Sequence, residues 1–173
     1  TTSNITKVIP RRDWANSTTF DMYEDNISAS NTTTSGATNL YDSTFFFKTS
    51  DNRVYMVLDN NGGTAYSGAE PTSESTASFV LGGYTLKFLY TISASQQATF
   101  TTTDFMPVST DSTISAAATD GAIESIIVTN AGSGLTNGTY YAAVYGDGTS
   151  AGTSSGAIIK IIVASNVISA VSL

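Results

Sequence analysis

The side chains that could carry chemistry in this chain are almost all carboxylates. The sequence contains no histidine and no cysteine, and it has 14 acidic residues against 7 Lys and Arg. Ser-His-Asp and Cys-His nucleophile systems are therefore excluded, together with the commonest transition-metal ligand. What remains is carboxylate acid–base chemistry or the binding of hard cations through oxygen atoms.

Three carboxylates stand close together in the segment FDMYEDN, at Asp21, Glu24 and Asp25. A glycosidase needs two carboxyl groups, but its acid and nucleophile usually come from separate elements that face a cleft. A solvated acidic turn is the preferred interpretation. A carboxylate glycosidase is kept as a functional candidate, and its test is the turnover of a polysaccharide.

Two Asp-Gly pairs are candidate calcium loops, at Asp120–Gly121 and within Gly146–Thr149. Neither is followed by the further acidic positions that an EF-hand or a calcium β-roll supplies. We interpret both as plain turns. The sequence therefore predicts no metal site, no cofactor and no catalytic residue.

The stretch VIPRRDW, Val8 to Trp14, gathers charge in a chain where only 12% of residues are charged. Arg11 and Arg12 can form bidentate pairs with carboxylates, Asp13 can hold one of them, and Trp14 offers a large area for burial. Trp and Arg are enriched in interface hot spots, but the same set suits an internal corner that ties two loops together. The chemistry favours neither role.

Composition predicts a mostly β protein. Ser and Thr supply much of the polarity, and with Val, Ile, Tyr and Phe they fit pleated surfaces, whereas Gly and Asn supply turns. The net charge of −7 argues against a nucleic-acid partner. The longest apolar stretch, Ala157 to Ala164, is interrupted by Lys160 and is too short to span a membrane.

Several windows have the pattern of strands. Residues 53–58 precede an Asp-Asn-Asn-Gly-Gly turn, residues 82–92 alternate with one strongly apolar face, and residues 43–49 are apolar on both sides. The last pattern indicates a central or covered strand. One short helix of a turn or two is expected within 92–100.

Aromatic residues disappear at Pro107–Gly121, where small polar residues take over. We therefore predict a β-sandwich core domain at 1–108, a linker at 109–120 and a smaller Gly-rich β module at 121–173. Because the chain opens without Met or a signal peptide, we expect the core to be partial at its N-terminus.

The β module contains an internal repeat that can be aligned in two registers. The segment Gly121–Val128 matches both Gly156–Val163 and Asn166–Leu173. We prefer the second register, in which Ala151–Ser165 becomes a strand inside the repeat unit. The first copy would be a strand followed by a turn, so the chain is expected to stop within a repeat.

Six aromatic residues could form a platform on which sugar rings stack, as in β-sandwich lectin modules. Strand aromatics more often pack in cores and at their rims, and packing is the preferred interpretation. The six are Tyr84, Phe88, Tyr90, Tyr140, Tyr141 and Tyr145.

Four blocks, in order, resemble the family of baseplate wedge proteins known in T-even phages as gene product eight. The blocks are KVIPRRDW (7–14), VYMVLDNNGG (54–63), AEPTSES (69–75) and GGYTLKFLYTI (82–92). The resemblance covers about Lys7 to Val108. Leu86 stands where many relatives have Trp, and the segment after Asp111 matches no part of the T-even protein.

The resemblance implies a β-sandwich core, a subunit that forms a homodimer, and a structural role without catalysis. Its partners would be other baseplate wedge subunits, and its location the tail baseplate of a virion assembled in the host cytoplasm. On this basis Arg11, Arg12, Asp13, Trp14, Glu70 and Pro71 are candidate interface or structural anchor residues. The alternative function is a receptor-binding or carbohydrate-binding β module at a virion or cell surface.

Overall fold

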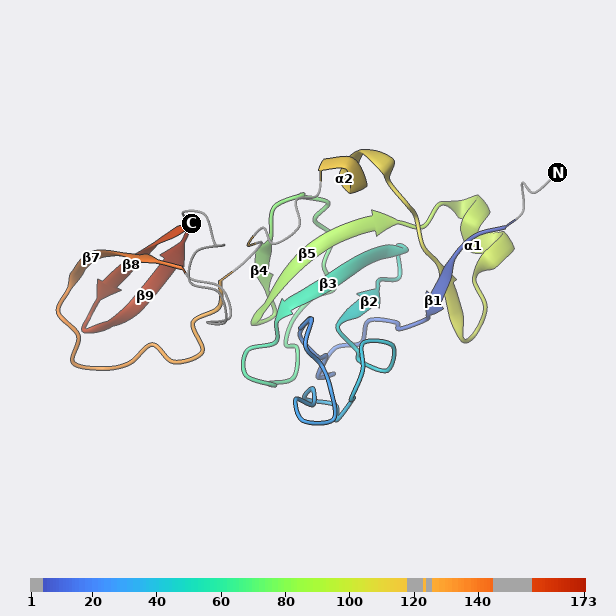
Figure 1. The fold of residues 1–173 in the computed structure, drawn as a ribbon. Coiled ribbons are helices and arrows are strands. Elements are labelled where there is room, and N and C mark those ends of the chain that lie inside the picture. The colour runs from blue at the N-terminus through green and yellow to red at the C-terminus, as the bar shows by residue number, and fades with distance from the viewer. Residues whose placement is uncertain (1–4, 118–122, 124–125, 145–156) are drawn as a thin grey trace. The chain divides into compact units, whose positions relative to one another are not determined.

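The computed structural model describes residues 5–117, 123, 126–144 and 157–173 (Figure 1). Internal contacts divide the chain into two units, residues 1–118 and 119–173. The division falls inside the segment predicted as a linker. That segment is not wholly extended, because helix α2 (Ser112–Ala117) forms within it.

The first unit is built on a four-stranded antiparallel sheet and a separate two-stranded ribbon. The strand order in the sheet is β2-β3-β5-β4, and the ribbon pairs β1 with β6. Strands predicted at 53–58 and within 82–92 are confirmed as β3 and β5. The bounds are β1 (Val8–Pro10), β2 (Phe46–Lys48), β3 (Arg53–Asp59), β4 (Phe79–Leu81), β5 (Tyr84–Thr91) and β6 (Phe105–Pro107).

Local sequence signals fix the ends of two elements. The turn after β3 is confirmed, with Asn61, Gly62 and Gly63 all at positive φ. The expected short helix is α1 (Ala94–Phe100), and the hydroxyl of Ser93 accepts a bond from the Gln96 backbone N–H. The Gln96 side chain in turn accepts from the Ser93 backbone, which completes a capping box.

Two hydrophobic clusters cover opposite faces of the four-stranded sheet. Neighbouring residues of β2 point to opposite sides, so Phe46 belongs to one cluster and Phe47 to the other, and Val54 and Tyr55 divide in the same way on β3. Met106 brings the ribbon onto the Phe46 side. The result is a small, uneven sandwich-like core, and the mostly β fold is confirmed.

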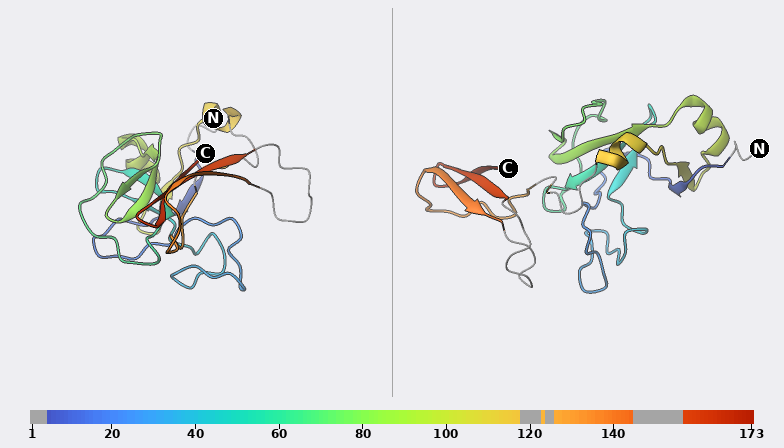
Figure 2. Two further views of the ribbon diagram at one scale, coloured as in Figure 1. Left: turned by 90° about the vertical axis from the view of Figure 1, so that its left-hand side faces the viewer. Right: turned by 45° about the horizontal axis from the view of Figure 1, so that its top comes forward.

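The loops between β1 and β2 run along one side of the sheet (Figure 2). They carry Phe20, which packs with Tyr66 from the β3–β4 connection in the cluster that contains Phe47. Loops, rather than a second full sheet, therefore cover that face.

Strand β5 does not have the single apolar face that its alternation predicted. Val54 pairs with Tyr90 and Tyr55 pairs with Phe88, so Leu89 is an extra residue in the ladder. This β-bulge reverses the side-chain alternation. Leu86 and Phe88 pack in the Phe47 cluster, whereas Leu89 and Tyr90 pack in the Phe46 cluster.

Strand β2 is covered, as its pattern predicted, but it is an edge strand rather than a central one. It is also shorter than the predicted window of 43–49. All three of its residues are buried. Something other than a neighbouring strand of the sheet must therefore cover its outer edge.

The second unit is a three-stranded antiparallel sheet in the order β7-β8-β9, with bounds β7 (Gly138–Ala143), β8 (Ile158–Ala164) and β9 (Val167–Ser172). Ser165 and Asn166, both at positive φ, join β8 to β9 in a two-residue hairpin turn. The first repeat copy was predicted to be a strand, but residues 123 and 126–128 lie outside any strand. Both candidate calcium loops and Tyr145 fall outside the described residues.

Within the described ranges, the two helices are too short to cross a membrane. Helix α1 has seven residues and α2 has six.

Gly82 should be much less tolerant of a side chain than Gly62. Both have positive φ, so alanine costs about 1–2 kcal/mol at either site. A Cβ at Gly82 would also lie 2.5 Å from Cζ of the buried Tyr66 ring, whereas at Gly62 it meets nothing within 4 Å. Overpacking should add about 1–3 kcal/mol to the cost of Gly82→Ala. Urea unfolding of both variants measures the difference, and equal losses would contradict this packing.

Candidate functional site

The segment from Arg12 to Trp14 covers the outer edge of β2. The backbone N–H of Lys48 donates to the carbonyl of Arg12 at 2.7 Å, and the N–H of Trp14 donates to the carbonyl of Lys48 at 2.8 Å. Asp13 and Lys48 thus form a parallel bridge. An exposed strand edge is a template for unwanted pairing, and these bonds occupy it.

Asp13 connects two cations at this corner. Its Oδ2 accepts from Nη2 of Arg11 at 2.7 Å, and its Oδ1 lies 3.4 Å from Nζ of Lys48. The Lys48 side chain is only 6% exposed, so Asp13 compensates a largely buried charge. The hydrogen bonds from Arg11 lower the pKa of Asp13, helped by the charge of Lys48. Arg11 also donates to the carbonyl of Thr102, which ties the corner to the segment before β6.

Arg12 holds the loop that leads into β2. Its Nη2 donates to the carbonyls of Tyr41 and Asp42 at 2.9 and 3.0 Å. The guanidinium carbon lies 5.6 Å from the centre of the Phe46 ring, within range of a cation–π contact. Its Nε is buried without a hydrogen-bond partner.

Trp14 packs edge-on against Tyr66, with ring centres 5.8 Å apart. It is partly buried at the rim of the Phe47 cluster, and its indole N–H is buried without a partner. Tyr66 is fully buried and donates its hydroxyl to the carbonyl of Ala69. The contact therefore links the corner to the β3–β4 connection.

Glu70 contacts a different place, the turn between β2 and β3. The Glu70 carboxylate accepts from the Ser50 backbone N–H at 2.6 Å and from the Ser50 hydroxyl at 2.5 Å. Pro71 is fully buried. All of these contacts of the predicted anchor residues lie within the chain, and their role in an interface stays a prediction.

The acidic turn was predicted to be solvated, which is wrong for Asp21, because its side chain is inside the fold at 1% exposure. Its carboxylate accepts four hydrogen bonds, from the Ser35 N–H and hydroxyl, the Thr44 N–H and the Ser43 hydroxyl. Burial alone would raise the pKa of Asp21, but the bonds from Ser35 and Thr44 outweigh it and lower the pKa. The group is held as a structural anion, which argues against a glycosidase role.

The sequence interpretation missed Lys48 as well as the buried state of Asp21. A signal for Lys48 is present, because it directly follows three Phe residues in a window that is apolar on both sides. A lysine there must either leave the strand face or find partners. It donates to the carbonyl of Thr49 and to Oδ1 of Asn52, in addition to its contact with Asp13.

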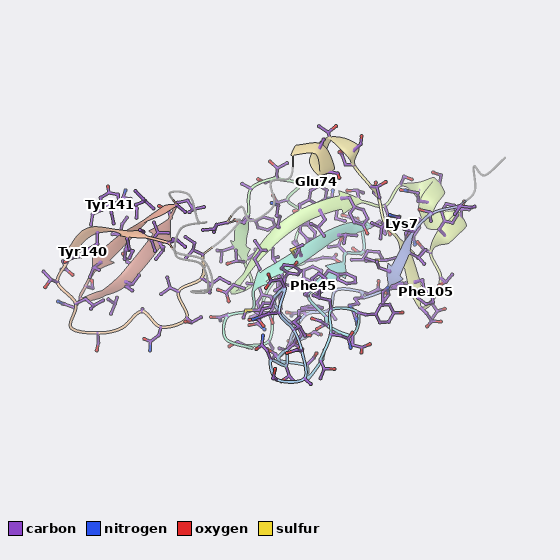
Figure 3. All side chains as sticks on the ribbon, viewed as in Figure 1. Lys7, Phe45, Glu74, Phe105, Tyr140 and Tyr141 are labelled. Carbon is purple, nitrogen blue, oxygen red and sulfur yellow. The ribbon has the colours of Figure 1, made fainter. Side chains whose placement is uncertain are left out.

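The aromatic residues considered as a sugar-stacking platform fall into a buried group and an exposed group. Tyr84 is fully buried and Tyr90 packs in the Phe46 cluster, so both are core residues. Tyr140 and Tyr141 lie on β7 and are 44% and 69% exposed (Figure 3).

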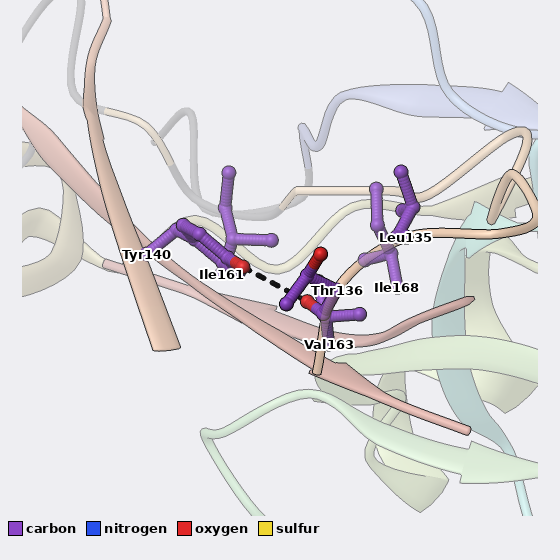
Figure 4. Close-up of a pocket in the computed structure, with 6 residues that line it drawn as sticks. All are labelled: Leu135, Thr136, Tyr140, Ile161, Val163 and Ile168. Atoms are coloured by element: carbon purple, nitrogen blue, oxygen red, sulfur yellow. Dashed lines mark hydrogen bonds between the residues drawn. The ribbon is translucent and has the colours of Figure 1, made fainter. Parts of the chain in front are cut away.

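A pocket of about 390 Å³ opens on one face of the second unit (Figure 4). The hydroxyl of Tyr140 donates to the carbonyl of Thr136 at its wall. Most of the lining is aliphatic, which suits an apolar group better than a sugar, whose hydroxyls need polar partners. The lining residues are Leu135, Thr136, Tyr140, Ile161, Val163 and Ile168.

We predict that Trp14→Ala will destabilise the first unit by about 2–4 kcal/mol, because it removes a partly buried ring that packs on Tyr66. Trp14→Phe should cost less than about 1 kcal/mol, since it keeps a ring and removes the unpaired N–H. Guanidinium unfolding measures both variants. A loss well under 1 kcal/mol for Trp14→Ala would show that the corner is not held by this ring.

Acid should weaken the fold through Asp21. Because its pKa is lower in the folded state, its contribution to stability is present above the unfolded pKa of about 3.9 and is lost as the pH falls through the folded value. Asp21→Asn should therefore be less stable than the wild type at pH 7 and show a smaller loss below pH 4. Unfolding midpoints from pH 7 to pH 2 test this, and parallel curves for the two proteins would contradict it.

No cluster of three or more acidic side chains that could hold a metal ion occurs among the residues that the structure describes. No family model, no curated protein and no solved structure matches the chain in the comparisons with known proteins.

Proposed function

We propose that this chain is a structural subunit of a phage tail baseplate wedge, which joins neighbouring baseplate proteins through protein–protein contacts and performs no catalysis. The observation that carries the proposal is the position of the four blocks that resemble the gene product eight family. They are separated in sequence, yet two of them pair as neighbouring strands and the other two pack against or bond to the same sheet.

Two of the blocks form the centre of that sheet, since 54–63 contains most of β3 and 82–92 contains β5, its partner. The block at 7–14 contains β1 and the corner on the edge of β2. The block at 69–75 binds β3, where the Tyr55 hydroxyl donates to the carbonyl of Ser73 and Nε of Arg53 donates to Glu74. Proteins with a common fold are expected to share the segments that form and border its central sheet. The arrangement of the four blocks therefore supports the resemblance.

The use of the charged groups supports a scaffold rather than an enzyme. Arg11, Arg12, Asp13 and Asp21 make their bonds to other parts of the same chain and fix loops to the sheet. A catalytic carboxylate must instead reach a substrate and exchange protons. Charged side chains bonded in this way fix the loops to the sheet. The first unit can then act as a rigid body that holds partner subunits in fixed relative positions.

In this role the mechanism is mechanical. The subunit would form a homodimer, contact other wedge subunits in the tail baseplate, and move as a whole when the baseplate rearranges on host contact. A surface rich in Ser, Thr and Tyr suits hydrogen-bonded, water-containing interfaces.

The second candidate function is a receptor-binding or carbohydrate-binding module at a virion or cell surface. The exposed Tyr140 and Tyr141 on β7 favour it, because aromatic rings stack on sugars. Binding to a glycan array, abolished by Tyr141→Ser, would support this alternative over the scaffold.

Location separates the two functions most directly. We expect immunogold labelling of parent virions, with an antibody to this chain, to mark the end plate of the tail in electron micrographs. Label at fibre tips would instead favour the receptor-binding module. If virions carry no label, mass spectrometry of purified particles decides the matter, and the absence of peptides from this chain would overturn a virion role.

A further inference from the structure

The chain contains two Asn-Gly pairs, Asn61–Gly62 and Asn137–Gly138, which lie in different surroundings. Asparagine before glycine is prone to lose its side-chain ammonia spontaneously, because glycine leaves the backbone nitrogen that attacks the amide unhindered. The reaction needs a free side-chain amide and a free backbone N–H on the next residue. The two pairs differ in both of these groups.

Both reacting groups of Asn61–Gly62 are free. The two residues are exposed in the turn after β3. Asn61 is held only through its backbone, by bonds to the Asp59 carboxylate and from the Thr64 N–H, and among the described residues neither its side-chain amide nor the Gly62 N–H has a hydrogen-bond partner. A Cβ at Gly62 would meet nothing within 4 Å, so the peptide nitrogen has room to rotate toward the Asn61 side chain.

Both reacting groups of Asn137–Gly138 are engaged. The side-chain oxygen of Asn137 accepts from the Asn166 backbone N–H at 2.9 Å. Gly138 begins β7, in a ladder where the Val144 N–H bonds the Ala157 carbonyl. Because N–H groups alternate in direction along an antiparallel pair, the Gly138 N–H also points to β8. The amide and the backbone nitrogen must therefore both be released before this pair can react.

The residue before the exposed pair connects this turn to the rest of the unit. Asn60 is 3% exposed, and its side-chain nitrogen donates to the carbonyl of Phe20 and to the hydroxyl of Thr34, both at 3.0 Å. Its side-chain oxygen accepts from the Gly63 N–H at 2.9 Å. The Asn60 amide is thus protected, and it holds the loop that carries Phe20. A change in the backbone at Asn61 would disturb these bonds.

We propose that Asn61 is a site of spontaneous deamidation, where the turn after β3 is converted to aspartate and isoaspartate. The Gly62 backbone nitrogen forms a bond to Cγ of Asn61, the Cγ–Nδ2 bond breaks, and the proton of the Gly62 N–H leaves with Nδ2 as ammonia. Water then opens the five-membered imide. Attack at Cγ gives aspartate, and attack at the backbone carbonyl gives isoaspartate. The reaction does not depend on the function proposed above.

The products should weaken the turn. Both place a new carboxylate next to Asp59, whose side chain accepts from the Asn61 N–H. Isoaspartate also lengthens the main chain by one methylene, so the bond from the Gly63 N–H to the Asn60 carbonyl, 3.2 Å long, can no longer close the turn in the same way. The loop bound by the Asn60 side chain would then be held less firmly, and the modified protein should unfold at a lower temperature.

The test keeps the whole chain in neutral buffer for several weeks and follows each asparagine by peptide mapping and mass spectrometry. We expect Asn61 to react first, and Asn137 about tenfold more slowly, because two ordinary hydrogen bonds must break there. In guanidinium, where neither bond survives, the two pairs should react at similar rates. If the native chain reacts equally at both pairs, or reacts only at Asn137, the proposal is overturned.

Two variants separate the effects of the reaction on stability. Asn61→Gly removes the amide and tolerates the positive φ of this position, so it should stop the reaction in the turn. Aged wild-type protein should lose several degrees of unfolding temperature, whereas aged Asn61→Gly should lose none. Asn61→Asp carries the new charge without the added methylene and should lose less than the aged wild type. Equal losses in aged wild type and aged Asn61→Gly would contradict the effect of this site on the turn.

Discussion

The first unit depends on the closure of one strand edge. Strand β2 lies at the end of its sheet with both faces buried, and only two backbone bonds to the Arg12–Trp14 segment cover its outer side. The same segment places Asp13 beside Lys48, so the strand and its buried ammonium are stabilised together. If the corner were displaced, the edge would open and Lys48 would lose its carboxylate. A single corner therefore controls both strand pairing and charge compensation.

A second constraint follows from covering a small sheet on both sides. Four strands offer two faces, and the chain covers one with the β1–β6 ribbon and the other with loops that carry Phe20 and Tyr66. The bulge at Leu89 lets β5 serve both faces, because side chains before and after it point to opposite sides. Loops can form such a cover only when they are fixed to the rest of the fold, and Arg11, Arg12 and Asp21 each make at least one bond to the backbone of a loop.

Much of the local structure was predictable, whereas features set by distant contacts were not. The strand at β3, the Asn-Gly turn after it and the short helix α1 are encoded within a few residues, and all three formed as expected. The alternation of side chains in β5 could not predict its bulge, because the bulge depends on how β5 pairs with Val54 and Tyr55 of β3. In the sequence Asp21 resembles any acidic loop residue. Only the folded chain brings Ser35, Ser43 and Thr44 close enough to bond its carboxylate. Residues 126–128 have a strand-like sequence without a strand, because pattern does not guarantee a partner.

The low charge of the chain gives its surface a particular character. Arg11, Arg12, Arg53 and Lys48 all bond within the first unit, so the described surface around the loops retains carboxylates and aromatic rings but little positive charge. Such a surface discriminates among partners by sign as well as by shape, since an acidic partner would meet uncompensated repulsion. The Arg12 guanidinium that bonds the Tyr41 and Asp42 carbonyls keeps its positive charge, because a carbonyl carries no compensating charge. Arg12 therefore offsets part of the negative charge of the loop that carries Asp42.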